Sequence, residues 1–163
     1  MTSDWIPVVV LFSIIVAIVA VVTIIIRGAF KGNTTRAVAS VLGLFAGVSG
    51  ASHGPGEILQ GNAAPSGIMI QAWPNLTLLG GEPAMTVLPS FLVAGVLAIV
   101  FGFIVATWAA WFVQRRNGGL VLILLSIMML LAGGGMFPPA FGVIAGIVGT
   151  RIKLVQPWGS GNK

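Results

Sequence analysis

The feature that most constrains this chain is a set of long apolar runs without charged side chains. The run from Ile6 to Ile26 contains no charged residue or histidine, and it is about as long as the ~20 residues that a helix needs to cross a bilayer. A second such run extends from Phe91 to Val113. Lipid offers no hydrogen bonds to the backbone, so uninterrupted apolar runs of this length must form helices. The sequence therefore predicts an all-α integral membrane protein.

The composition supports this interpretation. Hydrophobic residues make up 57% of the 163 residues and charged residues only 7%, whereas a soluble domain carries roughly 25% charged residues. The polar side chains are too few to cover a surface that faces water. The net charge is +5, but the basic residues lie at the edges of the apolar runs and form no dense patch, so we expect no nucleic-acid partner.

We predict a bundle of about five transmembrane helices, with the N-terminus outside and the C-terminus in the cytoplasm. The predicted spans are approximately residues 5–26, 37–53, 90–114, 119–134 and 138–154. Gly and Pro are frequent in residues 54–89, which are therefore expected to form one long outer loop. We expect residues 1–163 to form a single membrane domain in a prokaryotic plasma membrane, with the lipid bilayer as its first partner.

The positions of the basic residues favour five spans over four. Short cytoplasmic loops carry an excess of Lys and Arg. With five spans, all 8 Lys and Arg residues lie on the cytoplasmic side, whereas the acidic residues and the histidine lie outside. If residues 37–53 did not cross, Arg115 and Arg116 would lie opposite the basic residues of positions 27–36, and this segregation would be lost.

Small residues at four-residue spacing are predicted to hold the helices together. Lipid provides no hydrophobic drive between helices, so close backbone approach through small side chains supports their association. We expect spans 37–53, 90–114 and 138–154 to form the packed centre, and span 5–26 to face mostly lipid. The expected packing residues are Gly43, Gly47, Ala98, Gly102, Ala106, Gly142 and Gly146.

The polar side chains are concentrated at the outer end of the second predicted span, in residues 52–62. No predicted span carries a charged residue or histidine near its middle, which argues against a proton-coupled pump. His53 and Glu57 are four residues apart, a spacing that places side chains on one face of a helix. The intervening Gly54-Pro55-Gly56 is expected to interrupt a helix here. The shape of this segment is therefore left open.

Three interpretations of this segment remain. His53 and Glu57 could bond to each other or cap helix ends, a purely structural role. They could instead line an outward-facing pocket for a small polar or lipid-like ligand. The residues of that pocket would be His53, Glu57, Gln60, Asn62 and Trp73, the last as an apolar wall.

The third interpretation is a metal site at His53 and Glu57. A mononuclear site needs three or four ligands. Only Glu82 and Asp4 remain as further strong donors on the predicted outer side. The chain has no cysteine, so thiolate ligands and disulfides are excluded.

The leading functional hypothesis is a non-enzymatic accessory or assembly subunit of a membrane complex, or a homo-oligomer. Uncharged spans and small-residue faces suit helix association. The alternative is a membrane binding or transport protein with the outward-facing polar pocket, and a third hypothesis is a metal-dependent membrane enzyme. The sequence contains no phosphate-binding glycine signature or serine-nucleophile motif. It therefore assigns no catalytic residue and no cofactor.

The five-span topology predicts which side of the membrane exposes the loop at Arg115 and Arg116. The chain contains no cysteine, so Asn117→Cys introduces a single thiol. We expect a membrane-impermeant thiol reagent to label this cysteine in inverted vesicles and to leave it unlabelled in intact cells. Labelling from the external medium would contradict the topology and the outer placement of His53 and Glu57.

Overall fold

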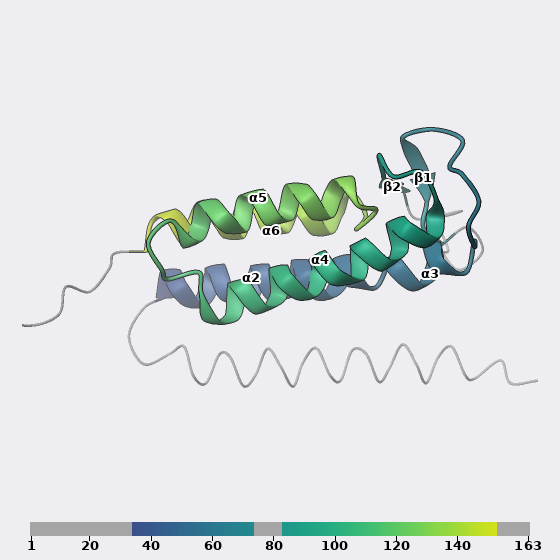
Figure 1. Ribbon diagram of the computed structural model, residues 1–163. Coiled ribbons are helices and arrows are strands. Elements are labelled where there is room, and N and C mark those ends of the chain that lie inside the picture. The colour runs from purple at the N-terminus through teal and green to yellow at the C-terminus, as the bar shows by residue number, and fades with distance from the viewer. Residues whose placement is uncertain (1–33, 74–82, 153–163) are drawn as a thin grey trace, which may run out of the picture.

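The computed structural model describes residues 34–73 and 83–152, and the predicted span 5–26 lies outside them. The described residues are mostly helical, with one small sheet at an end of the helices (Figure 1). The helices are α2 (Thr34–Ala51), α3 (Gly54–Ile58), α4 (Phe91–Trp111), α5 (Gly118–Leu131) and α6 (Phe137–Thr150), and the strands are β1 (Met69–Gln71) and β2 (Pro83–Met85).

Two stretches of these helices are long and apolar enough to cross a membrane. One is Thr34–Ile58, which combines α2 and α3, and the other is Phe91–Trp111, which is α4. Helices α5 and α6 are apolar but have 14 residues each, which corresponds to about 21 Å and is shorter than the ~30 Å hydrocarbon core. The arrangement with five spans stays a prediction.

The four longer helices lie side by side, and each runs antiparallel to the next in the chain (Figure 1). Helix α2 packs against both α4 and α6, while α5 packs against α6 and, less extensively, α4. The expectation that α2, α4 and α6 alone form the centre is therefore incomplete. Leu122 and Met129 of α5 are fully buried in the same core. These large side chains of α5 fill this part of the centre. They do not belong to the small-residue pattern from which the packing was predicted.

Backbone of α2 and α4 comes into very close contact through small residues. A Cβ placed on Gly47 would lie 2.5 Å from the Gly102 carbonyl oxygen and 2.5 Å from the Ala106 amide nitrogen. A Cβ placed on Gly102 would lie 2.6 Å from the Gly47 carbonyl oxygen. Each helix thus occupies the space that a side chain on the other would need. Gly47, Gly102 and Ala106, all expected packing residues, meet at this contact.

The remaining expected packing residues are also buried, but they do not all face the same partner. Gly43 lies against Ala109 of α4, and Ala98 is 0% exposed. On α6, Gly142 lies against Ser126 of α5, and a Cβ on Gly146 would lie 2.7 Å from the Gly119 carbonyl oxygen. The glycines of α6 therefore serve the contact with α5 more directly than one with α4.

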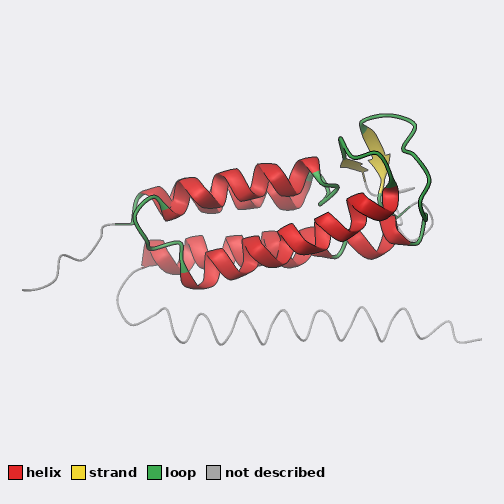
Figure 2. Cartoon of the chain, viewed as in Figure 1, coloured by secondary structure: helices red, strands yellow, loops and turns green. Residues whose placement is uncertain are grey.

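Residues 54–89, expected to form one long loop, contain regular structure at the end of the bundle (Figure 2). After the short helix α3, strand β1 pairs antiparallel with β2, with Ile70 opposite Ala84. Both of these residues face inward and are buried. The Val87 amide donates to the Leu131 carbonyl at 3.1 Å. This bond connects the sheet to the end of α5. Part of the segment predicted as a loop therefore has regular structure, because its two strands pair with each other.

The α2–α4 contact predicts a selective effect of one methyl group. Gly47→Ala should lower the free energy of unfolding by about 1–3 kcal/mol, because the new Cβ meets backbone, which cannot rotate away. Gly67→Ala is the matched control, since a Cβ there would meet nothing within 4 Å. Thermal unfolding of both variants in mild detergent measures the difference. Equal midpoints for the two variants would contradict this account of the contact.

Candidate functional site

His53 and Glu57 lie where α2 ends and α3 begins. Pro55 has no N–H group, so it cannot donate to the carbonyl of Ala51, and α2 ends at Ala51. The helical pattern then resumes, because the Glu57 amide donates to the His53 carbonyl at 3.3 Å. The expected interruption is thus confined to a single turn. As a result, the two side chains share a helical face across the interruption.

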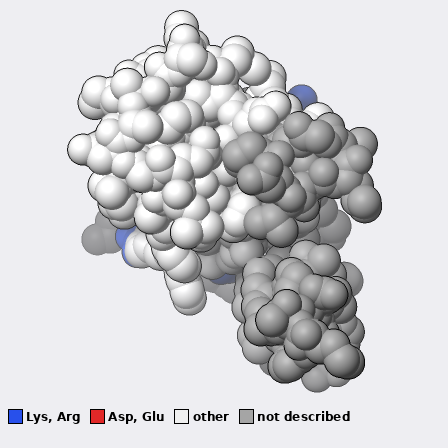
Figure 3. All heavy atoms as spheres, turned by 90° about the vertical axis from the view of Figure 1, so that its right-hand side faces the viewer, with Lys and Arg blue, Asp and Glu red and all other residues white. Residues whose placement is uncertain are grey.

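Both side chains are buried at this end of the bundle. Glu57 is 0% exposed and His53 is 2% exposed. Figure 3 faces this end of the molecule and shows no acidic side chain among the described atoms at the surface. Gly54 and Gly56 allow this burial, because a Cβ on Gly54 would contact the Gly95 carbonyl of α4 and a Cβ on Gly56 the Ala72 carbonyl beside β1. Helix α3 is therefore enclosed from two sides.

The glycine turn Gly133–Gly135, which joins α5 to α6, covers the two polar side chains. A Cβ on Gly133 would contact both carboxyl oxygens of Glu57, and a Cβ on Gly135 would contact Nε2 of His53. Gly133 has φ +105° and Gly135 has φ +77°, a backbone region that glycine adopts at no steric cost. Glycine is therefore required here by both backbone conformation and space.

One hydrogen bond fixes a hydrogen on the histidine ring. Its Nδ1 donates to the carbonyl of Ser49 at 2.9 Å. A carbonyl oxygen only accepts, so Nδ1 carries a hydrogen, and in the neutral tautomer with that hydrogen Nε2 is an acceptor. The Ser52 hydroxyl donates to the same Ser49 carbonyl at 2.6 Å. These bonds hold the imidazole with Nε2 directed at the glycine turn.

The carboxyl group of Glu57 has unused hydrogen-bonding capacity. Within residues 34–73 and 83–152, neither of its oxygens has a hydrogen-bond partner. An ionised carboxyl group away from water is costly unless a donor or a cation compensates it. Glu57 is therefore the group of this site that most needs a further partner.

The side chain of Gln60, one of the predicted pocket residues, forms hydrogen bonds with backbone carbonyl groups. Its Nε2 donates to the carbonyls of Gly56 at 3.2 Å, Gln71 at 3.0 Å and Ala72 at 3.3 Å. These bonds connect α3 to the end of β1. The Gln60 side chain is half-buried, and its hydrogen bonds stabilise the loop.

Trp73 and Asn62 are the other predicted pocket residues, and the Trp73 indole packs against Gly56, the residue before Glu57. The Trp73 indole Nε1 donates to the Ser52 carbonyl at 3.0 Å, which fixes the end of the hairpin against α2. Asn62 is exposed. The structure thus brings together His53 and Glu57 of the five predicted residues, and ligand binding by the set stays a prediction.

A groove beside His53 was not predicted from the sequence. Its volume is about 240 Å³, and it lies between α2 and the start of α6. The rings of Phe45 and Phe141 meet edge to face in it, with centroids 5.3 Å apart. The groove is lined by Phe45, Ser49, Ser52, His53, Phe137, Pro138 and Phe141. The one sequence feature that marks this groove is the Phe-Pro-Pro segment at the start of α6.

The described residues contain no cluster of three or more His, Asp or Glu side chains that could hold a metal ion. His53 and Glu57 supply two donors, whereas a mononuclear site needs three or four. Asp4 and Glu82, the further donors considered from the sequence, lie outside the described residues. The metal interpretation therefore gains no additional ligand from the fold.

Comparisons of the chain with protein-family models, with curated proteins and with solved structures found no match. Function is therefore inferred from the side chains of this site.

The unpartnered carboxyl group predicts an unusual response to an apolar substitution. Glu57→Met has a similar volume and removes two buried acceptors, so it should leave the thermal midpoint unchanged or raise it. Leu122→Ala is the control for ordinary core damage and should lower stability by about 2–5 kcal/mol. Thermal unfolding in mild detergent compares the two. A loss for Glu57→Met as large as that for Leu122→Ala would reveal a structural partner of the carboxyl group.

Proposed function

We propose that this chain is a multi-pass membrane protein of the binding or transport class, and that Glu57 and His53 recognise a small cationic ligand with an ammonium group. The observation that carries this proposal is the fully buried Glu57 carboxyl group, both of whose oxygens lack hydrogen-bond partners among the described residues. A protein that used this region for packing alone would gain stability from an apolar side chain here. An uncompensated carboxyl group suits a site that receives its partner from outside.

The distribution of charge supports a membrane arrangement with five spans. The arginines of the described residues lie at the start of α2, in the α4–α5 loop and just after α6, all at the end of the bundle opposite Glu57. With cytoplasmic arginines, His53 and Glu57 face the external side. The proposed ligand therefore enters from outside the cell or from the outer leaflet.

An ammonium group fits the donor set better than a metal ion does. It brings its own N–H donors, which the two Glu57 oxygens and the acceptor Nε2 of His53 can accept. A transition metal would require at least one further protein ligand. The described residues offer no third His, Asp or Glu at this position.

The groove beside His53 supports a ligand with an apolar part. Aromatic rings of Phe45, Phe137 and Phe141 line it, and ring faces attract cations. The Ser49 and Ser52 side chains and the imidazole are its polar lining groups. A short alkylammonium ion has both properties, with its apolar part in the groove beside His53; Glu57 lies beneath Gly133 and does not line the groove.

The role as an accessory subunit or homo-oligomer stays a prediction. Large apolar side chains are exposed on α4 and α5, among them Phe103, Trp111 and Leu124. Lipid would cover this surface as well as a partner helix would. The surface therefore does not favour a protein partner over the bilayer.

The proposed function is tested by thermal unfolding with butylammonium chloride, with sodium chloride at equal ionic strength as the reference. A ligand at a hundredfold excess over its Kd stabilises the folded state by about 2.7 kcal/mol. We expect butylammonium to raise the midpoint of the unmodified protein. Glu57→Gln and His53→Ala should abolish the rise, because each removes an acceptor from the site.

Asn62→Ala is the matched control, since Asn62 is a polar residue of the same segment but is exposed. It should keep the full response to butylammonium. A response that persists in Glu57→Gln would overturn the proposal. So would stabilisation by Zn²⁺ or Mn²⁺ that needs Glu57 while ammonium, methylammonium and butylammonium have no effect, because that result identifies a metal site.

A further inference from the structure

Positive charge accumulates at the end of the bundle opposite Glu57. Arg36 lies at the start of α2, Arg115 and Arg116 lie in the α4–α5 loop, and Arg151 follows α6. Among residues 34–73 and 83–152, Glu57 is the only acidic residue, and it lies at the other end. No described carboxylate therefore lies beside Arg115 and Arg116.

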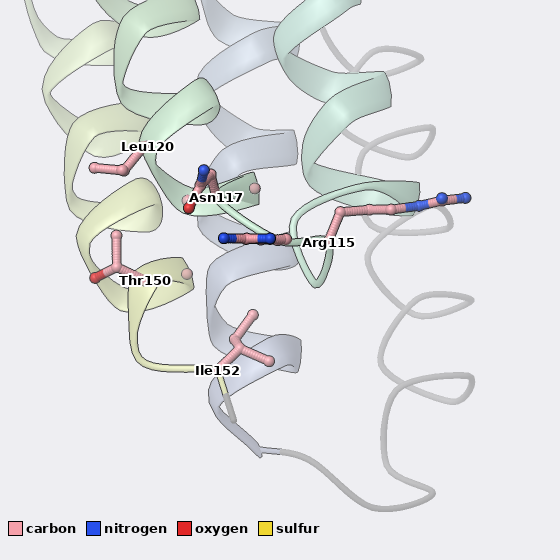
Figure 4. A pocket seen from close by; sticks show the side chains of 9 residues that line it. Arg115, Asn117, Leu120, Thr150 and Ile152 are labelled. Carbon is pink, nitrogen blue, oxygen red and sulfur yellow. The ribbon is translucent and has the colours of Figure 1, made fainter. Parts of the chain in front are cut away.

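A groove of about 530 Å³ lies at this end, between the α4–α5 loop and the end of α6. Figure 4 shows Asn117 and Leu120 beside the start of α5 and Thr150 and Ile152 beside the end of α6, while the side chain of Arg115 extends from the loop away from them. The groove combines basic, hydroxyl and apolar groups. Its lining residues are Arg115, Arg116, Asn117, Gly118, Gly119, Leu120, Gly149, Thr150 and Ile152.

The two loop arginines give this groove its chemistry. Arg115 and Arg116 are both exposed, and the guanidinium carbon of Arg115 lies 5.7 Å from the centre of the Phe112 ring. A ring at this distance attracts the cation and favours its position on the α4 side of the loop, because Phe112 is the C-cap of α4. The planar guanidinium group presents paired N–H donors that match the oxygens of a phosphate group.

The backbone at the same place adds to the attraction for anions. Helix α5 begins at Gly118, and Asn117 before it makes no side-chain capping bond. The first N–H groups of a helix have no partner within it and carry partial positive charge. Gly118 and Gly119 are themselves buried, and the Gly118 amide already donates to the Arg115 carbonyl at 2.8 Å, so the helix end acts on the groove through its field. This contribution supports the arginines and would not define a site without them.

We infer that this groove binds the phosphate of an anionic phospholipid headgroup in the leaflet at the arginine end. The two loop arginines supply the positive charge that attracts the phosphate, and Thr150 contacts the polar part of the headgroup. Leu120 and Ile152 border the glycerol and the first acyl carbons. This inference is independent of the ammonium site, because it involves other residues at the opposite end. Soluble phosphate has the same anionic chemistry, and the experiment separates the two sources.

The test is native mass spectrometry of the full chain after exchange into mild detergent with equal amounts of phosphatidylglycerol and phosphatidylcholine. We expect the unmodified protein to retain phosphatidylglycerol preferentially. The variant Arg115→Gln/Arg116→Gln should retain it about tenfold less, because the charge-assisted bonds are lost. Arg115→Lys/Arg116→Lys keeps the charge without the planar donors and should lose part of the binding.

The matched control is Arg36→Gln/Arg151→Gln. It removes the same charge from the same end of the bundle, but neither residue lines the groove. We expect it to retain phosphatidylglycerol within about twofold of the unmodified protein, because the phosphate contacts remain. Equal losses in the two double variants would overturn the inference, since binding would then reflect diffuse attraction to the whole end.

Two further outcomes are decisive. Equal retention of phosphatidylcholine would overturn the requirement for an anionic headgroup. Inorganic phosphate that binds in place of phosphatidylglycerol, with the same dependence on Arg115 and Arg116, would overturn the lipid source. Thermal midpoints of all variants are measured in parallel, and both arginines are surface residues whose replacement should leave the midpoint nearly unchanged.

Discussion

The close backbone contact between α2 and α4 is the constraint on which the other features depend. Gly47 and Gly102 allow the two helices to approach until the carbonyl of each occupies the side-chain space of the other. This approach brings the continuation of α2 against the start of α4, where Gly54 and Gly95 repeat the same kind of contact. The His53–Glu57 turn is enclosed because the two helices remain in contact up to that point.

The enclosed turn combines features that oppose stability. Glu57 is buried without a hydrogen-bond partner among the described residues, and Gly133 and Gly135 adopt positive φ values directly beside Glu57 and His53. Glycine at these positions loses more conformational freedom on folding than any other residue. An arrangement chosen only for packing would place apolar side chains here. Conflict between local stability and structure is common at functional sites, and this conflict is the physical basis of the proposed ligand site.

The two ends of the bundle carry opposite chemistry, and the helices between them separate it. The described arginines lie at one end, and the buried carboxyl group and imidazole lie at the other. Between the ends, exposed side chains such as Phe103 and Leu124 are apolar. This separation would isolate the proposed ammonium ligand at one end from the proposed lipid headgroup at the other. The same polarity is the basis of the proposed orientation in a membrane.

The sequence by itself determined the helical character of the chain, the approximate limits of four described helices and the polar spacing of His53 and Glu57. These features follow from local rules, because apolar runs, glycine stripes and four-residue spacing are properties of neighbouring residues. The sequence did not reveal the pairing of β1 with β2, because strands of three residues leave almost no periodic signal.

Only the tertiary structure decided which groups meet. The glycine turn lies 76 residues after Glu57 in the chain (133 − 57), and its contact with the carboxyl group depends on how α5 and α6 pack against α2. The same packing buried Glu57 and His53, left Asn62 exposed and assigned Gln60 and Trp73 to the loop backbone. Such contacts depend on side-chain volumes across several helices at once. No local pattern contains that information, and the site therefore emerged from the fold.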